Sequence, residues 1–305
     1  MADTKRQVSR PNNYYASLEI TNGVMFSTTM EQRPERVTDL LREMFPDEQI
    51  GNVTPSDPTA DPAVYINGEQ TFSPVVYAHG VRYDVFHTDG RLLFDVEMHN
   101  LNKWNDKVTA IDFKRLIKRT RYAHSVMDIT SFPKNEDYIN LKRHYVVYIR
   151  TFDLLGESGY RYEPIIPWFE GYPNILFDED RRTIFFNTKG NKGEIAPRMK
   201  EILKYMNDPK TYPVSKTDVA WIQEVDAAVK FNRQNPEWRR NYEMLAMYVN
   251  DAVIEAKQEG RQEERKLSAI VIKLLNNGHT PIEISKSKQI PLDDVLAIQK
   301  EYEED

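Results

Sequence analysis

The run HYVVYIRTF at residues 144–152 constrains the fold more than any other part of the sequence. It is short, apolar and rich in β-branched and aromatic residues, which is typical of a strand buried on both faces. Strand-like sequence precedes it in VVYAHG, VRYDVFH and RLLFDVEMH, and Thr88-Asp89-Gly90 favours a hairpin turn between the last two. A buried strand of this kind must be covered by other layers, so we expect helices on the sheet faces.

Helical periodicity supplies those layers. Apolar residues at helical spacing predict a first helix from Pro34 to Phe45 and a second from Lys107 to about Ile129. Shorter strands near 160–166 and 183–186 and a helix near 195–206 complete an α/β domain with a mixed sheet flanked by helices. By contrast, residues 51–63 hold three prolines and predict a loop.

The sequence changes character after Pro213 and becomes helical and charged to its end. We therefore predict an α/β domain at residues 1–215 and an all-helical C-terminal region at residues 216–305. The long charged helix through EAKQEGRQEERK favours self-association into a homo-oligomer. The last three helices could also form a helix-turn-helix-like bundle, although their recognition face is not basic.

Composition limits the chemistry and the partners. The sequence has no cysteine, so a metal ion would be held by oxygen or histidine ligands. No apolar run approaches the ~18 residues that span a bilayer, and the N-terminal residues lack the apolar core of a signal peptide, so we expect no membrane partner and a cytoplasmic protein. The net charge of -6 argues against bulk electrostatic binding to nucleic acid, but permits a local basic groove.

The strand RLLFDVEMH carries the candidate site. Alternation places Leu92, Phe94, Val96 and Met98 on a core face and Asp95, Glu97 and His99 on the opposite face. Hairpin pairing would bring Asp84 beside Glu97, and two converging carboxylates suit Mg²⁺ or Mn²⁺. Such an ion could activate water and neutralise charge on a phosphodiester. The alternative is a half-exposed strand whose polar residues simply face solvent.

The helix after the hairpin strengthens the case for a nucleic-acid substrate. Its basic residues lie within two turns, opposite the apolar stripe: Lys114, Arg115, Lys118, Arg119 and Arg121. Such a face could neutralise DNA phosphates. A solvated helix surface would have the same composition.

Six segments in order resemble the recombination-promoting nuclease (Rpn) family of PD-(D/E)xK nucleases and transposases: TNGVMFSTTM, VRYDV, DVEMH, KRTRYAHSVMD, YINLKRHYVVYIRTFD and FFNTKG. The resemblance covers nearly the whole chain, including the charged helical tail. It implies a restriction-endonuclease-like core and metal-dependent DNA endonuclease activity associated with recombination. In this likeness Asp84 and Glu97 match the family's metal ligands.

Other positions match the family pattern less closely. His99 stands where the family usually has glutamine and the wider superfamily has lysine. Gly23 replaces an aspartate that commonly follows Asn22, and Ser27 also departs from the pattern. Glu69 is a candidate third metal ligand. Arg121 and Tyr122 match an arginine-tyrosine pair that would face substrate or support the active site, with Asp95 also in a supporting role.

Three hypotheses follow. The first is a Mg²⁺-dependent endonuclease in which Asp84, Glu97 and His99 form the catalytic site. The second is a nuclease-fold protein that has lost efficient catalysis and binds DNA or a protein partner as an oligomer. The third is a regulatory assembly protein whose helical tail is the functional part.

Overall fold

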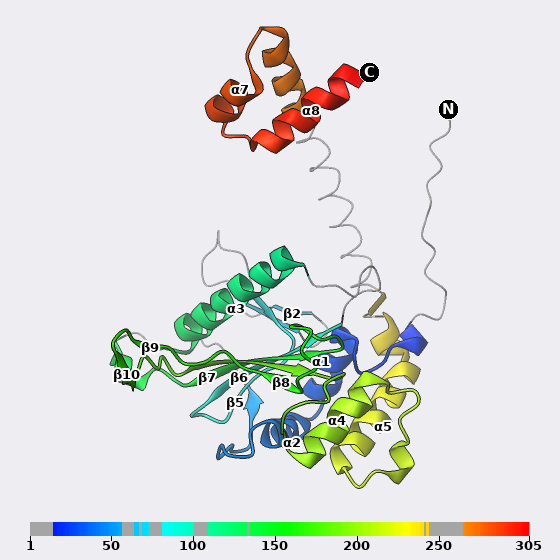
Figure 1. Cartoon of the computed structure of the whole chain (residues 1–305). Helices are drawn as coiled ribbons and strands as arrows, with labels where there is room; N and C mark the ends of the chain where they lie inside the picture. The colour runs from blue at the N-terminus through cyan, green and yellow to red at the C-terminus, as the bar shows by residue number, and fades with distance from the viewer. Residues whose placement is uncertain are drawn as a thin grey trace. The chain divides into compact units, whose positions relative to one another are not determined.

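The computed structural model describes residues 15–56, 64–66, 69–72, 81–100, 109–132, 135–240, 242–243 and 265–304. The chain divides into two compact units, Met1–Glu243 and Met244–Asp305 (Figure 1). The first unit is an α/β domain, and the described residues of the second are helical except for its connecting turns. The predicted fold class is thereby confirmed at the level of a mixed sheet with helices and a helical C-terminal region.

A six-stranded mixed sheet forms the centre of the first unit, in the order β1-β5-β6-β7-β11-β8. Its pairings are antiparallel except for β6–β7 and β7–β11, which are parallel. Every residue of β7 is buried, as predicted for the apolar run. The strands are β1 (Thr54–Pro55), β5 (Phe86–Thr88), β6 (Leu93–His99), β7 (His144–Arg150), β8 (Arg161–Tyr162) and β11 (Arg181–Asn187).

Helices cover both faces of this sheet (Figure 1). One face packs against α1 (Gly23–Glu31), α2 (Pro34–Met44), α4 (Pro197–Asn207) and α5 (Ala220–Gln234) in a single large apolar cluster. The opposite face packs against α3 (Ala110–Ser131) in a smaller cluster. Short 3-10 helices occur at η1 (Tyr15–Ser17), η2 (Tyr138–Asn140) and η3 (Val214–Lys216).

The boundaries of α2 and α3 follow local sequence signals. Pro34 occupies the first position of α2, where its missing N–H is not needed. Thr109 caps α3 and forms a reciprocal capping box with Asp112, which places the start of the helix three residues after the predicted one. In contrast, α1 was not predicted, because residues Met25 to Met30 are all buried and the segment has no polar stripe.

Two smaller sheets accompany the central one. The first is antiparallel and joins β2 (Val64–Ile66), β3 (Glu69–Phe72) and β4 (Val81–Tyr83); the second pairs β9 (Trp168–Phe169) with β10 (Tyr172–Leu176). The segment VRYDVFH, expected as one strand, is divided at Asp84 and Val85 between β4 and β5. VVYAHG lies outside the described residues. Within the predicted loop at 51–63, β1 forms a two-residue strand at the sheet edge, a position that accepts Pro55.

The first unit extends beyond the predicted boundary at residues 215 and 216. Helix α5 buries Trp221, Ile222 and Val225 in the large apolar cluster, and the indole Nε1–H of Trp221 donates to the carbonyl oxygen of Arg36 at 2.8 Å. These contacts join α5 to α1 and α2, so the compact unit continues to Glu243.

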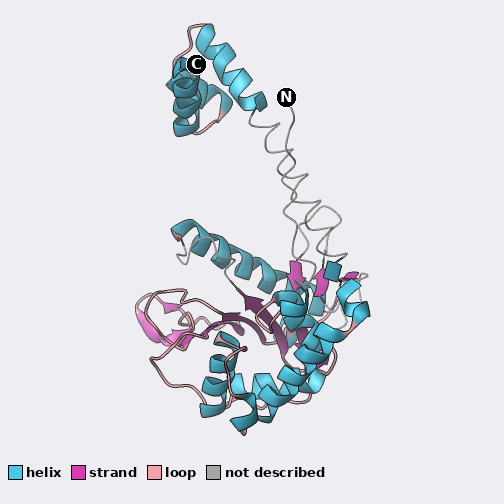
Figure 2. Ribbon diagram, turned by 90° about the vertical axis from the view of Figure 1, so that its right-hand side faces the viewer, coloured by secondary structure: helices cyan, strands magenta, loops and turns pink. Residues whose placement is uncertain are grey.

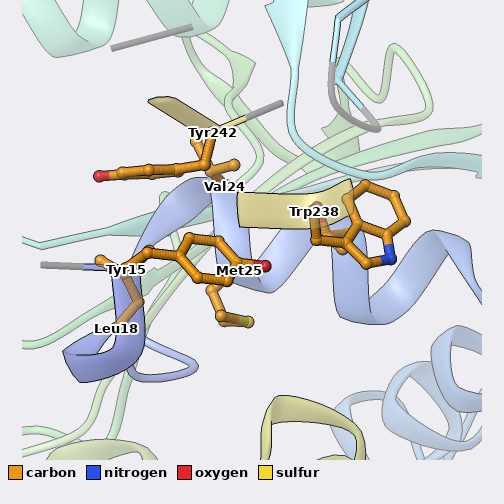
Figure 3. Close-up of a pocket in the computed structure, with 7 residues that line it drawn as sticks. Tyr15, Leu18, Val24, Met25, Trp238 and Tyr242 are labelled. Atoms are coloured by element: carbon orange, nitrogen blue, oxygen red, sulfur yellow. The ribbon is translucent and has the colours of Figure 1, made fainter. Parts of the chain in front are cut away.

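The N-terminal edge of the described chain also packs on this helical layer. Tyr15 donates its hydroxyl hydrogen to the carbonyl oxygen of Asn232 at 2.8 Å, and its ring lies 5.5 Å from that of Tyr242. A hollow of about 10 Å³ remains between these rings, Met25 and Trp238 (Figure 3). That volume holds about one water molecule, so it is a packing defect and not a ligand site.

The second unit has its own small core. Residues 265–276 are helical and are followed by α7 (Pro281–Lys288) and α8 (Leu292–Glu304). Val271, Ile284 and Val295 are buried together at their centre. Thr280 and Glu283 form a capping box at the start of α7, and Pro281 follows at a first-turn position that needs no N–H donor. Residues 244–264, which include most of the predicted long charged helix, lie outside the described residues.

Candidate active site

The hairpin brings Asp84 to the middle of β6. The observed register pairs Phe86 with Asp95, and the backbone N–H of Val96 donates to the carbonyl oxygen of Val85 at 3.0 Å, so the chain follows β6 as far as Val85. The chain leaves regular pairing there, so the Asp84 carboxylate oxygen Oδ2 instead accepts the backbone N–H of Met98 at 3.0 Å. Asp84 therefore lies between β4 and β5 and binds the residue that follows Glu97, whereas its predicted pairing with Glu97 is not among the observed strand pairs.

The carboxylates of β6 lie inside the protein. Asp95 is 0 % exposed and Glu97 is 1 % exposed, whereas His99 is partly exposed. The alternative of a strand with a solvent-facing polar side is therefore wrong, because α3 covers that face. Burying two carboxylates is costly unless charge or hydrogen bonds compensate, so their surroundings determine what the site can do.

Two side chains hold Glu97. The Nη2 group of Arg119 lies 3.0 Å from each carboxylate oxygen of Glu97, and Nε2 of His99 lies 2.9 Å from Oε2. The Arg119 side chain is half exposed and reaches down from α3, so it supplies positive charge from the solvent side. Arg119 was expected to face DNA phosphates, but its guanidinium binds Glu97.

A second arginine fixes the state of His99. Arg150 Nη2 lies 3.0 Å from His99 Nδ1. Arginine can only donate, so Nδ1 must be the acceptor and Nε2–H must donate to Glu97. The chain Arg150, His99, Glu97 thus fixes the orientation of the imidazole.

Asp95 is the least compensated group of the site. Neither carboxylate oxygen has a hydrogen-bond partner among the described residues. Burial raises the pKa of Asp95 well above its usual range, and the nearby charges of Glu97 and Asp84 raise it further. Three carboxylates therefore compete for limited positive charge on this face of the sheet.

The donor chemistry of this cluster suits a hard divalent ion. Asp84 and Glu97 offer oxygen ligands, and a cation between them would relieve the repulsion that raises the pKa of Asp95. Within the described residues, no group of three or more histidine, aspartate or glutamate side chains is arranged to hold a metal ion. The side chain of Glu69, the predicted third ligand, lies outside the described residues. Metal binding would require Arg119 to release Glu97.

Gly23 faces the Asp84 carboxylate from the start of α1. A Cβ placed on Gly23 would lie 3.6 Å from Asp84 Oδ2 and 3.9 Å from the carbonyl oxygen of Met98. Both distances are ordinary van der Waals contacts, so a side chain at this position would point at the candidate site without a steric clash. The position at which the Rpn likeness leads us to expect aspartate, Gly23, therefore lies beside Asp84.

The other predicted basic residues remain on the outer surface of α3. Lys114, Arg115, Lys118 and Arg121 are exposed, and only Arg115 among them has an ion-pair partner within the described residues, Asp112 at 3.7 Å. Tyr122 is 38 % exposed on the same helix. The structure thus separates Arg119, which points into the site, from a basic outer face.

Sequence reasoning missed two residues that shape the site, Arg150 and Tyr148. Arg150 is 6 % exposed, and its guanidinium lies 4.5 Å from the ring centre of Phe152; burial lowers its pKa to about 10. Tyr148 packs its ring 4.7 Å from that of His99 and its hydroxyl lies 3.1 Å from Oγ1 of Thr120. The available signal was alternation in HYVVYIR, which puts Tyr148 and Arg150 on one face beside Glu97 and His99.

Comparison of this chain with known protein families, with curated proteins and with solved structures finds no match in any of the three. The described helices include none that is both long and apolar enough to cross a bilayer. The chemistry of the site must therefore be argued from its own residues.

Proposed function

We propose that the chain is a Mg²⁺- or Mn²⁺-dependent DNA endonuclease with a PD-(D/E)xK-like core. The observation that carries the proposal is that Asp84 binds the backbone of β6 at Met98, the residue after the buried Glu97. Its charge also acts on the buried Asp95, whose carboxylate has no hydrogen-bond partner among the described residues. A buried carboxyl with a raised pKa, such as that of Asp95, is typical of catalytic sites. The ordered likeness of six sequence segments to the Rpn family supports the same function.

In this proposal the carboxylates bind the metal ion and the basic residues of α3 bind the DNA phosphates. Asp84 and Glu97 would hold the ion, with Glu69 as the third-ligand candidate. When bound, such an ion lowers the pKa of a water molecule and neutralises charge on a phosphodiester. Lys114, Arg115, Lys118 and Arg121 would neutralise DNA phosphates along α3. His99, held by Arg150, would orient the Glu97 carboxylate.

Plasmid cleavage with purified protein in Mg²⁺ and in Mn²⁺ tests the proposal. Asp84→Asn and Glu97→Gln should each lower the cleavage rate at least about 100-fold, because each removes a metal-binding oxygen. Glu35→Gln, an exposed carboxylate on α2, is the matched control and should cleave at the wild-type rate. Equal far-UV circular dichroism would show that the variants are folded. Wild-type cleavage in EDTA, or full activity of both site variants, would contradict the proposal.

A second candidate function has its own observation. Glu97 is fully engaged by Arg119 and His99, as expected if an arginine has replaced the ion in a catalytically reduced protein that binds DNA or a protein partner as an oligomer. Here wild-type protein would shift DNA in a gel but leave it intact with either ion.

Two substitutions separate these candidates. Gly23→Asp adds a carboxylate next to Asp84, and Arg119→Met frees Glu97. If the site is reduced, the double variant should bind Mn²⁺ more tightly than wild type by calorimetry, and cleavage should rise from none. If the wild-type site is active, Arg119→Met should instead weaken cleavage, because it removes a cation that can contact the DNA phosphates once the metal ion has displaced it from Glu97.

A further inference from the structure

The β9–β10 hairpin exposes an unusual amount of apolar surface. We call residues 164–180 the hairpin arm; it lies at the margin of the first unit in both views (Figure 1, Figure 2). Six of its apolar residues are 50–64 % exposed: Trp168, Phe169, Tyr172, Ile175, Leu176 and Phe177. Contiguous exposed apolar side chains of this kind mark a surface that binds a partner.

The charge of the arm excludes DNA as the favoured partner. The arm contains Glu170, Asp178, Glu179 and Asp180 and has no lysine or arginine. The last three pair with arginines at the base of the arm, whereas no ion pair found in the described parts of the chain involves Glu170 at the tip. An acidic, aromatic tip would be repelled by phosphates and needs a basic, apolar receptor.

Such a receptor lies at the base of the same arm. A cavity of about 300 Å³ opens between α3 and the arm's first residues. Phe113, Ile117, Pro164 and Phe185 give it an apolar lining, and Ile117 is 51 % exposed there. Two arginines also line it: Arg181, which pairs with the lining carboxylate Glu179, and Arg121, which no ion pair identified in the described residues engages. We call this the α3 cavity.

We propose that two copies of this chain form a dimer in which the arm tip of each copy binds in the α3 cavity of the other. The apolar side chains of the arm would cover Phe113 and Ile117, and Glu170 would meet Arg121. Because each copy carries both arm and cavity, a two-fold axis satisfies both contacts at once. This interface differs from the C-terminal helices predicted from the sequence. It would take Arg121 out of the proposed DNA-binding face and leave Lys114, Arg115 and Lys118 to the phosphates.

Disulfide trapping tests the pairing directly, because the full-length chain has no cysteine of its own. Tyr172→Cys marks the arm and Ile117→Cys marks the cavity. A mixture of the two proteins under mild oxidation should give a disulfide-linked dimer, whereas a mixture of Tyr172→Cys with Tyr138→Cys should not. Tyr138 is a suitable control because it is 79 % exposed but lies on η2. Absence of the Tyr172–Ile117 product would overturn the proposal.

A charge exchange tests the same contact in solution. Sedimentation of the full-length wild type should give a dimer, and Glu170→Arg or Arg121→Glu should each weaken it at least about tenfold. The double variant should recover much of the lost affinity, because the opposite charges are restored with their positions exchanged.

Two outcomes would assign the surface differently and sink the proposal. If Tyr172→Asp leaves a stable dimer that is lost only when residues 244–305 are deleted, the helical tail forms the interface. If the wild type is a monomer and Tyr172→Asp lowers its affinity for DNA, the arm contacts nucleic acid. Loss of plasmid cleavage without loss of the dimer would count against the proposed enzyme function alone.

Discussion

The two faces of the β6–β7 pair differ in what they bury. The face toward α1, α2, α4 and α5 is apolar, and each of its six inner residues is at most 4 % exposed: Phe94, Val96, Met98, Tyr145, Val147 and Ile149. The face toward α3 carries Asp95, Glu97, His99, His144, Tyr148 and Arg150 in alternate positions of the same strands. One pair of strands therefore serves as core on one side and as candidate site on the other.

The apolar face of the β6–β7 pair stabilises the fold, and the opposite face of the same strands carries the candidate site. Apolar burial stabilises the first face, whereas ionisable groups on the second lose hydration that their partners replace only in part. Asp95 and the buried His144 have side-chain atoms without hydrogen-bond partners in the described region. A sequence under selection for packing alone would not keep such groups, which supports a functional role for the α3 face.

The largest effect should come from the apolar face. Phe94→Ala removes a fully buried ring that stacks on Tyr145 at 5.2 Å, so the free energy of unfolding should fall by roughly 3–5 kcal/mol. Urea unfolding followed by tryptophan fluorescence reports on the first unit, because every tryptophan precedes residue 244. Phe94→Leu is the matched control and should lose less. A loss below about 1 kcal/mol for the alanine variant would contradict the packing described here.

The next largest effect should be a loss of stability at acidic pH, caused by buried histidines on the α3 side of the sheet. Burial lowers the pKa of His124 to about 3 and of His144 to about 4, from 6.5. The unfolded chain then binds more protons, so stability is complete above pH 6.5 and falls as pH falls toward these folded values. Two such groups should lower the free energy of unfolding by roughly 2 kcal/mol between pH 6.5 and 5.5.

The urea midpoint measured at several pH values checks this dependence. The double variant His124→Gln with His144→Gln should show a smaller change of the urea midpoint with pH than the wild type. Some slope should remain from His87, whose pKa burial lowers to about 4 on the opposite face. An unchanged slope in the double variant would show that these histidines are not the buried, neutral groups of the structure.

The smallest predicted effect is a gain in stability, caused by substitution of Asp95. The pKa of Asp95 is raised, so this group favours folding below its unfolded value of about 3.9 and loses that contribution as pH rises through its folded value. Asp95→Asn should therefore raise Tm at pH 7, by roughly 2–4 °C, which corresponds to about 1 kcal/mol in a chain of this size. The gain should vanish near pH 4.

Asp89→Asn provides the opposing control. The Asp89 carboxylate accepts backbone N–H groups of Leu92, Gly51 and Arg91, which lower its pKa against the effect of burial. Its substitution should lower Tm at pH 7. A lower Tm for Asp95→Asn as well would mean that Asp95 is compensated by groups outside the described residues.

Period-two alternation was enough to predict both faces of β6 and the burial of Phe94, Val96 and Met98. It could not tell whether Asp95 and Glu97 face solvent, because that depends on α3, which packs through residues distant in sequence. Similarly, the hairpin turn predicted that Asp84 approaches β6, where its carboxylate accepts the backbone N–H of Met98. Arg119 was predicted to face DNA phosphates but binds Glu97, because the direction of its side chain depends on packing that composition does not encode.

Other elements were missed for definable reasons. Helix α1 is buried almost all round and so has no amphipathic signature. The β9–β10 hairpin places apolar side chains outward, against the usual rule for strands, and its sequence resembles a loop with prolines. The Rpn likeness, the catalytic role of His99 and the metal remain predictions, since they concern chemistry that a fold alone does not determine.

The parallel pairing of β6 with β7 also has a consequence for folding kinetics. Leu93 must find His144 after the chain has passed through the whole of α3, and parallel contacts between distant segments form slowly. Until β7 docks, Glu97 lacks its neighbour Tyr148 and His99 lacks Arg150. The carboxylates of β6 are therefore expected to stay hydrated through most of folding and to lose water only in its final stage.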